Sequence, residues 1–221
     1  MLRTTGLNVR RWFAACGAAA LILCAAPAFA EPAANPKLSS DDIQDLDRVS
    51  AYLNGLTTVT GDFSQIAQDG EMSEGKFYMS RPGRVRFDYK EPKDAPLLIA
   101  DGEYFSVEDR KLKSVARYPL NATPLNLLLR KDVDLAKDSR VVKVERQPGM
   151  LSVTARDDKG LAQGELTLIF HDPGLELRNW IIRDAQGNYT TIAVRDLKEG
   201  VQLDPALFTI KNMNTPTGRP K

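Results

Sequence analysis

The chain has 221 residues, with 30 lysines and arginines against 29 aspartates and glutamates, two cysteines and one histidine. Zinc and copper sites draw on several His or Cys ligands, so this composition argues against such a metal site. The balanced charge argues against a nucleic-acid partner, whose phosphates require a basic protein face. We therefore expect a protein that has no metal ion or other cofactor and does not bind nucleic acid.

Residues 1–30 have the pattern of a secretory signal peptide: a basic start, an apolar run and an Ala-x-Ala motif that ends at Ala30. The apolar run, residues 12–26, is shorter than the roughly 20 residues that a membrane-spanning helix needs. Arg10 and Arg11 also fit a twin-arginine export signal, so the choice between the two export routes stays open. Either route predicts a protein of the periplasm or the exterior.

Cleavage near Ala30 would remove 30 of the 221 residues and three of the 30 basic ones, which leaves 191 residues with 27 basic against 29 acidic groups. Cys16 and Cys24 would be removed with the signal, so the mature chain could form no disulfide. We expect residues 31–221 to form a single domain.

An amphipathic helix is predicted to begin at Ser39, whose side chain can cap free backbone N–H groups, while Asp42 favours the positive end of the helix. Apolar residues then recur every three to four positions as far as the stop at residues 54–55. The stripe consists of Ile43, Leu46, Val49 and Tyr52 or Leu53. This helix has one face to bury.

From residue 57 the apolar period changes to two, which is typical of strands. Short turns rich in Gly, Pro, Asn and Asp separate most of the segments, so neighbouring strands should be antiparallel. The predicted strands are 57–68, 74–81, 84–90, 96–101, 103–108, 112–117, 141–147, 150–156, 164–170, 175–183, 189–197 and 207–211.

Residues 121–135 interrupt this meander, because Thr123 and Pro124 resemble a helix start and a run of leucines follows. We expect a second short helix that presents Leu125, Leu128 and Leu129. The predicted fold is mainly β (α+β): one large, curved, unclosed antiparallel sheet, a half β-barrel, whose apolar face the two helices cover.

Two motifs that suggest catalysis or nucleotide binding fail on their context. Residues 70–76 fit G-x-x-x-x-G-K, but Phe77 follows where a phosphate loop needs Ser or Thr, and the pattern continues as a strand. His171 precedes Asp172 in an ordinary turn sequence and has no nucleophile motif beside it. We expect a hairpin turn at 69–70, a surface histidine and no enzyme.

The stretch 76–90 alternates large apolar residues with charged ones, as in two half-buried strands around a turn at 81–83. The two predicted helices can cover only part of so large a sheet. Part of its concave face is therefore expected to be available to a ligand.

Several segments, in chain order, resemble the periplasmic outer-membrane lipoprotein carrier family, LolA. They are GDFSQ at 61–65, EGKFYMSRPGRVRFDY at 74–89, IADG at 99–102, NATP at 121–124 and LDPALFTI at 203–210. The similarity extends over most of the mature chain. The family often has Phe where this chain has Val85 and Trp where it has Phe87, changes that leave an apolar pocket.

The resemblance implies a half barrel whose helical lid covers a hydrophobic cavity for the acyl chains of lipoproteins. It implies that Arg81 is the family's buried arginine, which holds the lid backbone in the empty form and releases it when lipid enters. The expected cavity residues are Phe77, Met79, Val85, Phe87, Tyr89 and Ile99. The expected lid residues are Ile43, Leu46, Val49, Leu125, Leu128 and Leu129.

The implied partners are acylated lipoproteins and an inner-membrane lipoprotein-releasing ABC transporter, with a separate outer-membrane receptor left open; we expect a monomer. Two other hypotheses also stay open. One is a carrier of the same fold for another lipid, such as a glycolipid. The other is a periplasmic module that recognises a polypeptide on the concave sheet.

Overall fold

In the computed structural model of the chain, the structure describes residues 38–91, 95–138, 140–157, 164–184 and 186–210. All of these lie within one compact unit, Asn35–Lys221. The predicted signal segment, its cleavage site and both cysteines lie outside the described residues.

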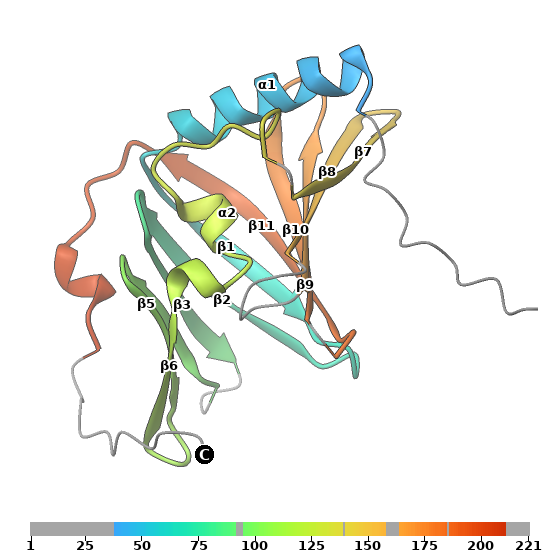
Figure 1. The fold of residues 1–221 in the computed structure, drawn as a ribbon. Helices are drawn as coiled ribbons and strands as arrows, with labels where there is room; N and C mark the ends of the chain where they lie inside the picture. The colour runs from blue at the N-terminus through green and yellow to red at the C-terminus, as the bar shows by residue number, and fades with distance from the viewer. Residues whose placement is uncertain (1–37, 92–94, 139, 158–163, 185, 211–221) are drawn as a thin grey trace, which may run out of the picture. The chain divides into compact units, whose positions relative to one another are not determined.

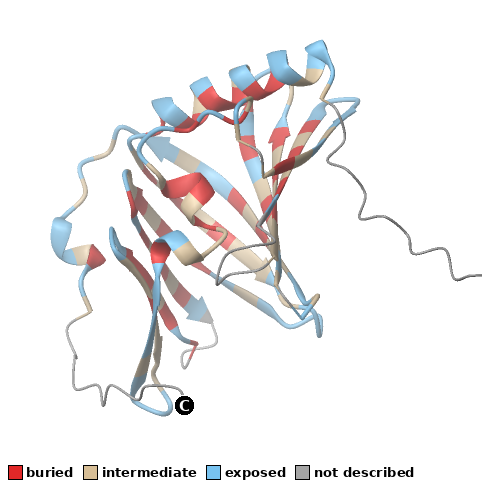
Figure 2. Cartoon of the chain, in the orientation of Figure 1, coloured by how far each residue is buried: buried red, intermediate tan, exposed pale blue. Residues whose placement is uncertain are grey.

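Helix α1, Ser40–Gly55, begins and ends where the sequence predicts. Ser39 and Asp42 form a reciprocal capping box, in which each side chain accepts a hydrogen bond from the other residue's backbone N–H at 3.1 and 2.9 Å. The inner face of α1 carries Leu46, Val49 and Leu53, none of them exposed to solvent. Figure 2 shows this buried face turned toward the strands.

The sheet has eleven strands in the described residues, and every pairing between neighbours is antiparallel. The strands are β1 Thr58–Ile66, β2 Met72–Ser80, β3 Arg84–Glu91, β4 Leu97–Asp101, β5 Tyr104–Asp109, β6 Ser114–Pro119, β7 Val141–Gln147, β8 Met150–Asp157, β9 Gly164–His171, β10 Glu176–Asp184 and β11 Tyr189–Glu199. Their order is β6-β5-β4-β3-β2-β1-β11-β10-β9-β8-β7, so the unpaired edges are β6 and β7 and the sheet does not close. The predicted half barrel is confirmed (Figure 1).

This strand order explains why a lid exists. Strands β6 and β7 are consecutive in the chain but lie at opposite edges of the sheet, so the segment between them must cross it. That segment contains a 3₁₀ helix, η1, at Leu120–Ala122 and one short α-helix, α2, at Asn126–Leu129. In Figure 1 both lie over the same side of the sheet, between its two arms.

Two predicted elements are wrong in extent or type. The second short helix expected within 121–135 is only the single turn α2, which η1 precedes, and residues 130–138 are irregular chain. Thr123 does not cap α2; its hydroxyl donates to the carbonyl of Leu120 at 2.8 Å. Of the strand predicted at 207–211, residues 207–208 instead end a 3₁₀ helix, η2, Pro205–Phe208, which Asp204 caps, residues 209–210 form no strand, and residue 211 lies outside the described residues.

The remaining turn predictions are confirmed. Residues 70–76 run from the β1–β2 turn into β2, with no helix after them. His171 is exposed at the end of β9. Apolar residues of α1, the lid and the concave sheet face form one continuous core.

Candidate ligand-binding site

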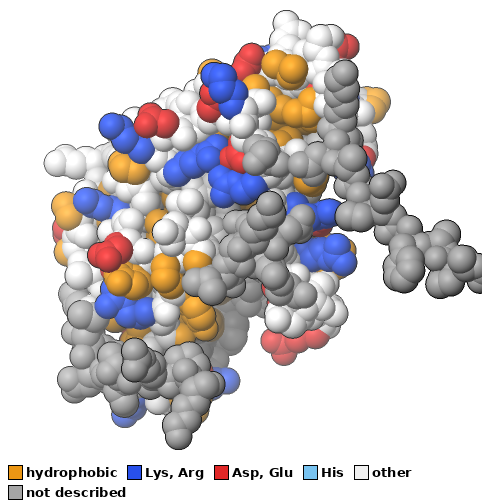
Figure 3. Space-filling model, in the orientation of Figure 1, with side chains coloured by type: hydrophobic (Ala, Val, Ile, Leu, Met, Phe, Trp, Pro, Cys, Tyr) orange, Lys and Arg blue, Asp and Glu red, His pale blue; other side chains and the backbone are white. Residues whose placement is uncertain are grey.

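An apolar cavity of about 670 Å³ lies between the concave face of the sheet and the lid segment. Its walls come from β1, β3, β4, β5, β6, β10 and β11, from Pro96 and from residues 122–125 of the crossing segment. On the face seen in Figure 3, hydrophobic side chains gather over the β6 side, and Tyr118 of β6 is 52% exposed. A cavity of this size and character suits a hydrophobic ligand.

A smaller apolar space adjoins this cavity beneath α2. Phe87, Leu125 and Trp180 line both spaces. The two apolar spaces therefore share part of their wall.

The predicted cavity residues are distributed over both spaces, with one exception. Phe87 and Tyr89 line the larger cavity, whereas Phe77, Met79 and Val85 line the smaller one. Rings pack edge to face within this wall, with Phe63 and Phe87 centroids 5.3 Å apart.

Ile99 does not line the cavity, so this expectation is wrong. It is 1% exposed, in a separate cluster with Leu97 and Phe208 that includes residues of the C-terminal segment. Its neighbour Leu98 lines the cavity instead. Strand β4 is apolar on both faces because the C-terminal segment covers the outer one, and alternation therefore could not identify the inner face.

The predicted lid residues are buried with one exception. On the crossing segment, Leu125, Leu128 and Leu129 are buried, and all three line the smaller space. Leu46 and Val49 lie in the core, but Ile43 is 43% exposed, so its assignment to the buried stripe is wrong. The first turns of α1 make ion pairs in addition to the apolar contacts of Leu46.

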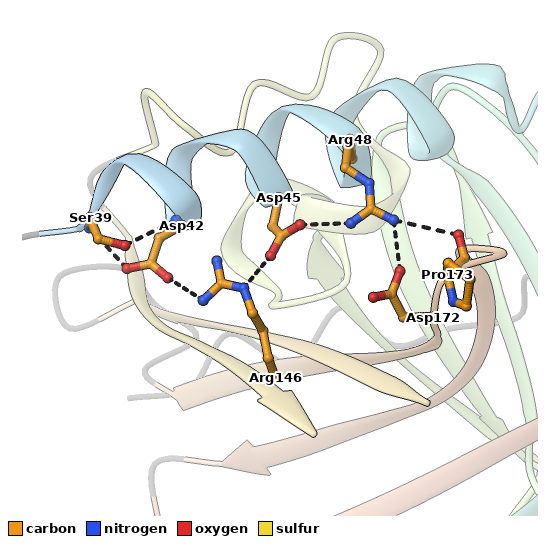
Figure 4. Close-up of polar contacts among 7 residues, drawn as sticks. All are labelled: Ser39, Asp42, Asp45, Arg48, Arg146, Asp172 and Pro173. Atoms are coloured by element: carbon orange, nitrogen blue, oxygen red, sulfur yellow. Dashed lines mark hydrogen bonds and ion pairs between the residues drawn. The ribbon is translucent and has the colours of Figure 1, made fainter. Parts of the chain in front are cut away.

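Those ion pairs link α1 to the end of strand β7 and to the turn after strand β9 (Figure 4). Arg146 at the end of β7 lies 2.9 Å from Asp42 and 2.6 Å from Asp45. Arg48 joins Asp45 to Asp172, at 2.7 Å in each case. The hydrogen bonds that Asp42 accepts from Ser39, with that from Arg146, lower the pKa of Asp42. The network fixes the position of α1 over the sheet.

Arg81, in the turn between β2 and β3, contacts the lid. Its Nη2 atom donates to the carbonyl of Arg130 at 2.5 Å and lies 3.5 Å from that of Lys131. The backbone N–H of Gly83 donates to the carbonyl of Leu129 at 2.8 Å. This turn is therefore hydrogen-bonded to the backbone at the end of α2 and just after it.

The environment of Arg81 is costly for a cation. Burial lowers its pKa, and the positive charge of Arg130 lowers it further. Its Nε and Nη1 atoms are buried without a hydrogen-bond partner among the described residues. A half-satisfied buried charge makes a contact that a competing interaction can break.

The irregular chain after α2 has its own anchors. Asp138 forms ion pairs with Arg130 at 2.8 Å and with Arg140 at 2.7 Å. Burial alone would raise the pKa of Asp138, but the hydrogen bonds from the side chain and backbone of Arg140 outweigh it and lower the pKa to about 2. Asn54 and Ser50 of α1 bind the backbone of Val133 and Leu135.

Two polar groups in the cavity wall were missed by the sequence analysis. The hydroxyl of Tyr89 donates to Oε1 of Gln65 at 2.6 Å, and burial raises the pKa of Tyr89 to about 12. Trp180 is 2% exposed, and its Nε1 atom has no hydrogen-bond partner among the described residues. The only available signal was that Gln65 belongs to the GDFSQ segment and Trp180 to a predicted strand.

Within the described ranges, no cluster of three or more His, Cys, Asp or Glu side chains could hold a metal ion. The same part of the chain contains no helix with the length and apolar character needed to cross a membrane.

The open antiparallel sheet with an apolar cavity beneath a short lid defines the class of protein as a half barrel with a hydrophobic cavity. The sequence profile described as outer membrane lipoprotein carrier protein LolA matches residues 54–211. The chain belongs to the LolA family.

Two relatives in sequence agree with this assignment. The outer-membrane lipoprotein carrier protein of Legionella pneumophila (strain Corby) is 31% identical over 176 residues, which cover 74% of this chain and 83% of that protein. That of Methylococcus capsulatus is 26% identical over 171 residues, covering 73% and 80%. A LolA superfamily protein of Nitrosomonas europaea aligns in structure with a TM-score of 0.42 and 11% identity, covering 76% of this chain and 97% of that one.

Proposed function

We propose that the protein is a periplasmic carrier that shields the acyl chains of lipoproteins and moves them from the inner to the outer membrane. The observation that supports this most directly is the apolar cavity of about 670 Å³ beneath a lid that few polar contacts hold. The protein acts by binding and release, without a chemical step.

The need for such a carrier follows from the cost of exposing acyl chains to water. Each methylene contributes roughly 0.8 kcal/mol, so several long chains together cost tens of kcal/mol. Non-covalent affinities saturate near −20 kcal/mol, and a carrier that bound this tightly would not release its cargo. A cavity that covers the chains partially and adapts to them is better suited to transfer.

Arg81 is the proposed latch of the lid. Its hydrogen bond to the carbonyl of Arg130 favours the closed lid, whereas acyl chains entering beneath α2 favour an open one. The opposing preferences create two states whose balance the ligand shifts. Phe77, Met79, Val85, Phe87 and Tyr89 are the proposed contacts of the acyl chains.

The proposed life cycle begins with removal of residues 1–30, which delivers residues 31–221 to the periplasm as a single soluble domain. We propose that this monomer receives lipoproteins from an inner-membrane ABC transporter and delivers them to the outer membrane or to a receptor there. Support comes from the signal-like N-terminus and from the family.

The test is to purify the protein from the periplasm and identify co-purifying lipids by mass spectrometry. We expect acylated lipoprotein, with much more of it on Arg81→Leu. Loss of a hydrogen bond to a charged group, about 1.5–3 kcal/mol, should shift the lid equilibrium tenfold or more toward the open state. Arg84→Leu, an exposed arginine three residues away, is the matched control.

Each result separates the hypotheses. Arg81→Leu protein that loads and releases like the wild type would contradict the latch. A bound glycolipid in place of lipoprotein would favour the alternative lipid carrier. Absence of any acyl ligand, together with capture of a polypeptide, would favour the recognition module.

A further inference from the structure

The larger cavity contains a polar pair in a wall that is otherwise mostly apolar. The hydroxyl of Tyr89 donates to Oε1 of Gln65 at 2.6 Å, and the Tyr89 ring is held edge to face against Phe63 with centroids 4.9 Å apart. Because the amide oxygen of Gln65 is engaged by a fixed partner, the orientation of the amide is fixed as well. Its Nε2 atom keeps two N–H donors, and no hydrogen bond joins them to another described residue.

Trp180 supplies a second donor in the same wall. Its side chain is 98% buried, yet its Nε1–H has no acceptor among the described residues. A buried donor without an acceptor costs free energy, and such groups in native proteins call for an explanation.

The two residues lie in one row across the sheet. Gln65 on β1 pairs with Ile192 on β11, and Ile192 pairs with Trp180 on β10. All three side chains line the larger cavity. Gln65 and Trp180 therefore flank an apolar side chain, with their backbones two strand spacings, about 10 Å, apart.

On the basis of the proposed carrier function, we propose that Gln65 and Trp180 form a recognition site for the carbonyl groups of acylated cargo, the ester or amide carbonyls that link acyl chains to their carrier molecule. A carbonyl is an acceptor without a donor, directly attached to hydrocarbon, and so matches free N–H donors set in an apolar wall. A bare hydrocarbon chain would fill the cavity but leave both donors unsatisfied.

The experiment compares a diacyl ester lipid with its dialkyl ether analogue of the same chain length and headgroup, which lacks the carbonyls. Their affinities are measured by displacement of a fluorescent hydrophobic probe, below the micelle concentration of either lipid. We expect wild-type protein to bind the ester lipid roughly three- to tenfold more tightly, the range that one or two net hydrogen bonds provide.

Gln65→Leu should bring the ratio of ester-lipid to ether-lipid affinity closer to one. It should do so by weakening ester-lipid binding, with ether-lipid binding unchanged or stronger. Trp180→Phe keeps an aromatic ring and should act in the same direction; thermal unfolding checks that it folds. Ser64→Ala, on the same strand but on the opposite face, is the control and should keep the wild-type ratio.

Equal affinities of wild-type protein for the two lipids would overturn the carbonyl site while the carrier function stands. A preference that persists in Gln65→Leu would overturn the role of these donors. Failure to bind either lipid would contradict the carrier function itself, and the site with it.

Discussion

Gly75 lies in β2 between Phe63 of β1 and Tyr89 of β3, its Cα partners on the two neighbouring strands. A Cβ atom at this position would lie 2.2 Å from the carbonyl oxygen of Asp88 and 2.8 Å from the Cα atom of Tyr89. The missing side chain lets strands β2 and β3 approach and lets the rings of Phe63 and Tyr89 meet. Glycine here determines where the Tyr89 hydroxyl, and so the Gln65 amide, can lie.

We expect Gly75→Ala to lower the free energy of unfolding by about 1–3 kcal/mol, the usual cost of forcing an extra group into a packed site. Urea denaturation followed by circular dichroism measures this change. The control is Gly55→Ala, because a Cβ atom at Gly55 has no atom within 4 Å and the helix end tolerates alanine. Equal stability of Gly75→Ala and Gly55→Ala would show that the close approach at β2–β3 yields without cost.

In the proposed function, the crossing segment between β6 and β7 is the element that opens and closes the cavity. Arg81 and Gly83 hold its backbone from the sheet, and Asn54 and Ser50 hold it from α1. Among its described residues, only the short helices η1 and α2 give it regular hydrogen bonding of its own. A segment with so little internal structure depends on these few anchors and can move as a unit when they are exchanged.

Asp138 should make this element sensitive to acid. Its pKa of about 2 lies below the ordinary value of 3.8, so the stabilisation is present above about pH 4 and is lost as the pH falls through about 2. The shift corresponds to about 2 kcal/mol of the free energy of unfolding. We expect Asp138→Asn to be less stable than wild type at pH 6 and to lose less stability between pH 5 and pH 2.

Denaturant unfolding at a series of pH values tests this prediction, with Asp47→Asn as the control because Asp47 is an exposed residue of α1. The free energy of unfolding of the wild type and that of Asp47→Asn should change with pH in nearly the same way. The curves of the wild type and Asp138→Asn should converge at low pH. Profiles of wild type and Asp138→Asn that stay parallel over the whole range would contradict the role of Asp138.

On the scale of the whole molecule, ligand binding should stabilise the half barrel, because cargo binds the folded chain alone. A lipid present at 100 times its dissociation constant contributes about 2.7 kcal/mol. For a chain of this size we expect Tm to rise by roughly 5–10 °C. Calorimetry with and without a diacyl lipid measures the shift.

Trp180 provides an independent reading of where the ligand lies. Of the two tryptophans in the sequence, only Trp180 would be left after the proposed cleavage, and it lines both apolar spaces. A lipid with brominated acyl chains should quench its fluorescence, whereas the unbrominated lipid of equal length should not. A rise in Tm without quenching would place the lipid outside the cavity.

Local patterns predicted the elements well where one interaction dominates. The Ser39–Asp42 capping box placed the start of α1, and alternation placed eleven of the twelve predicted strands. The failures lie where the surroundings decide. The leucine run at 125–129 predicted a second short helix, but only the single turn α2 forms, and the chain that follows is held by Arg81, Asn54 and Ser50 instead of by its own backbone. The apolar residues at 207, 208 and 210 pack in a cluster with Leu97 and Ile99 of β4 and do not form a strand.

The sequence by itself determined the class of fold, the family and the identity of Arg81 as a residue of interest, because periodicity, turn residues and motif order are local properties of the chain. Only the tertiary structure decided which face of β4 looks inward, and it replaced Ile99 with Leu98 in the cavity wall. It also brought Gln65, Tyr89 and Trp180 together from three separate strands. The physical reason is that an eleven-stranded sheet covered on parts of both faces buries apolar residues of either parity, so register and burial are set by long-range pairing that no local pattern records.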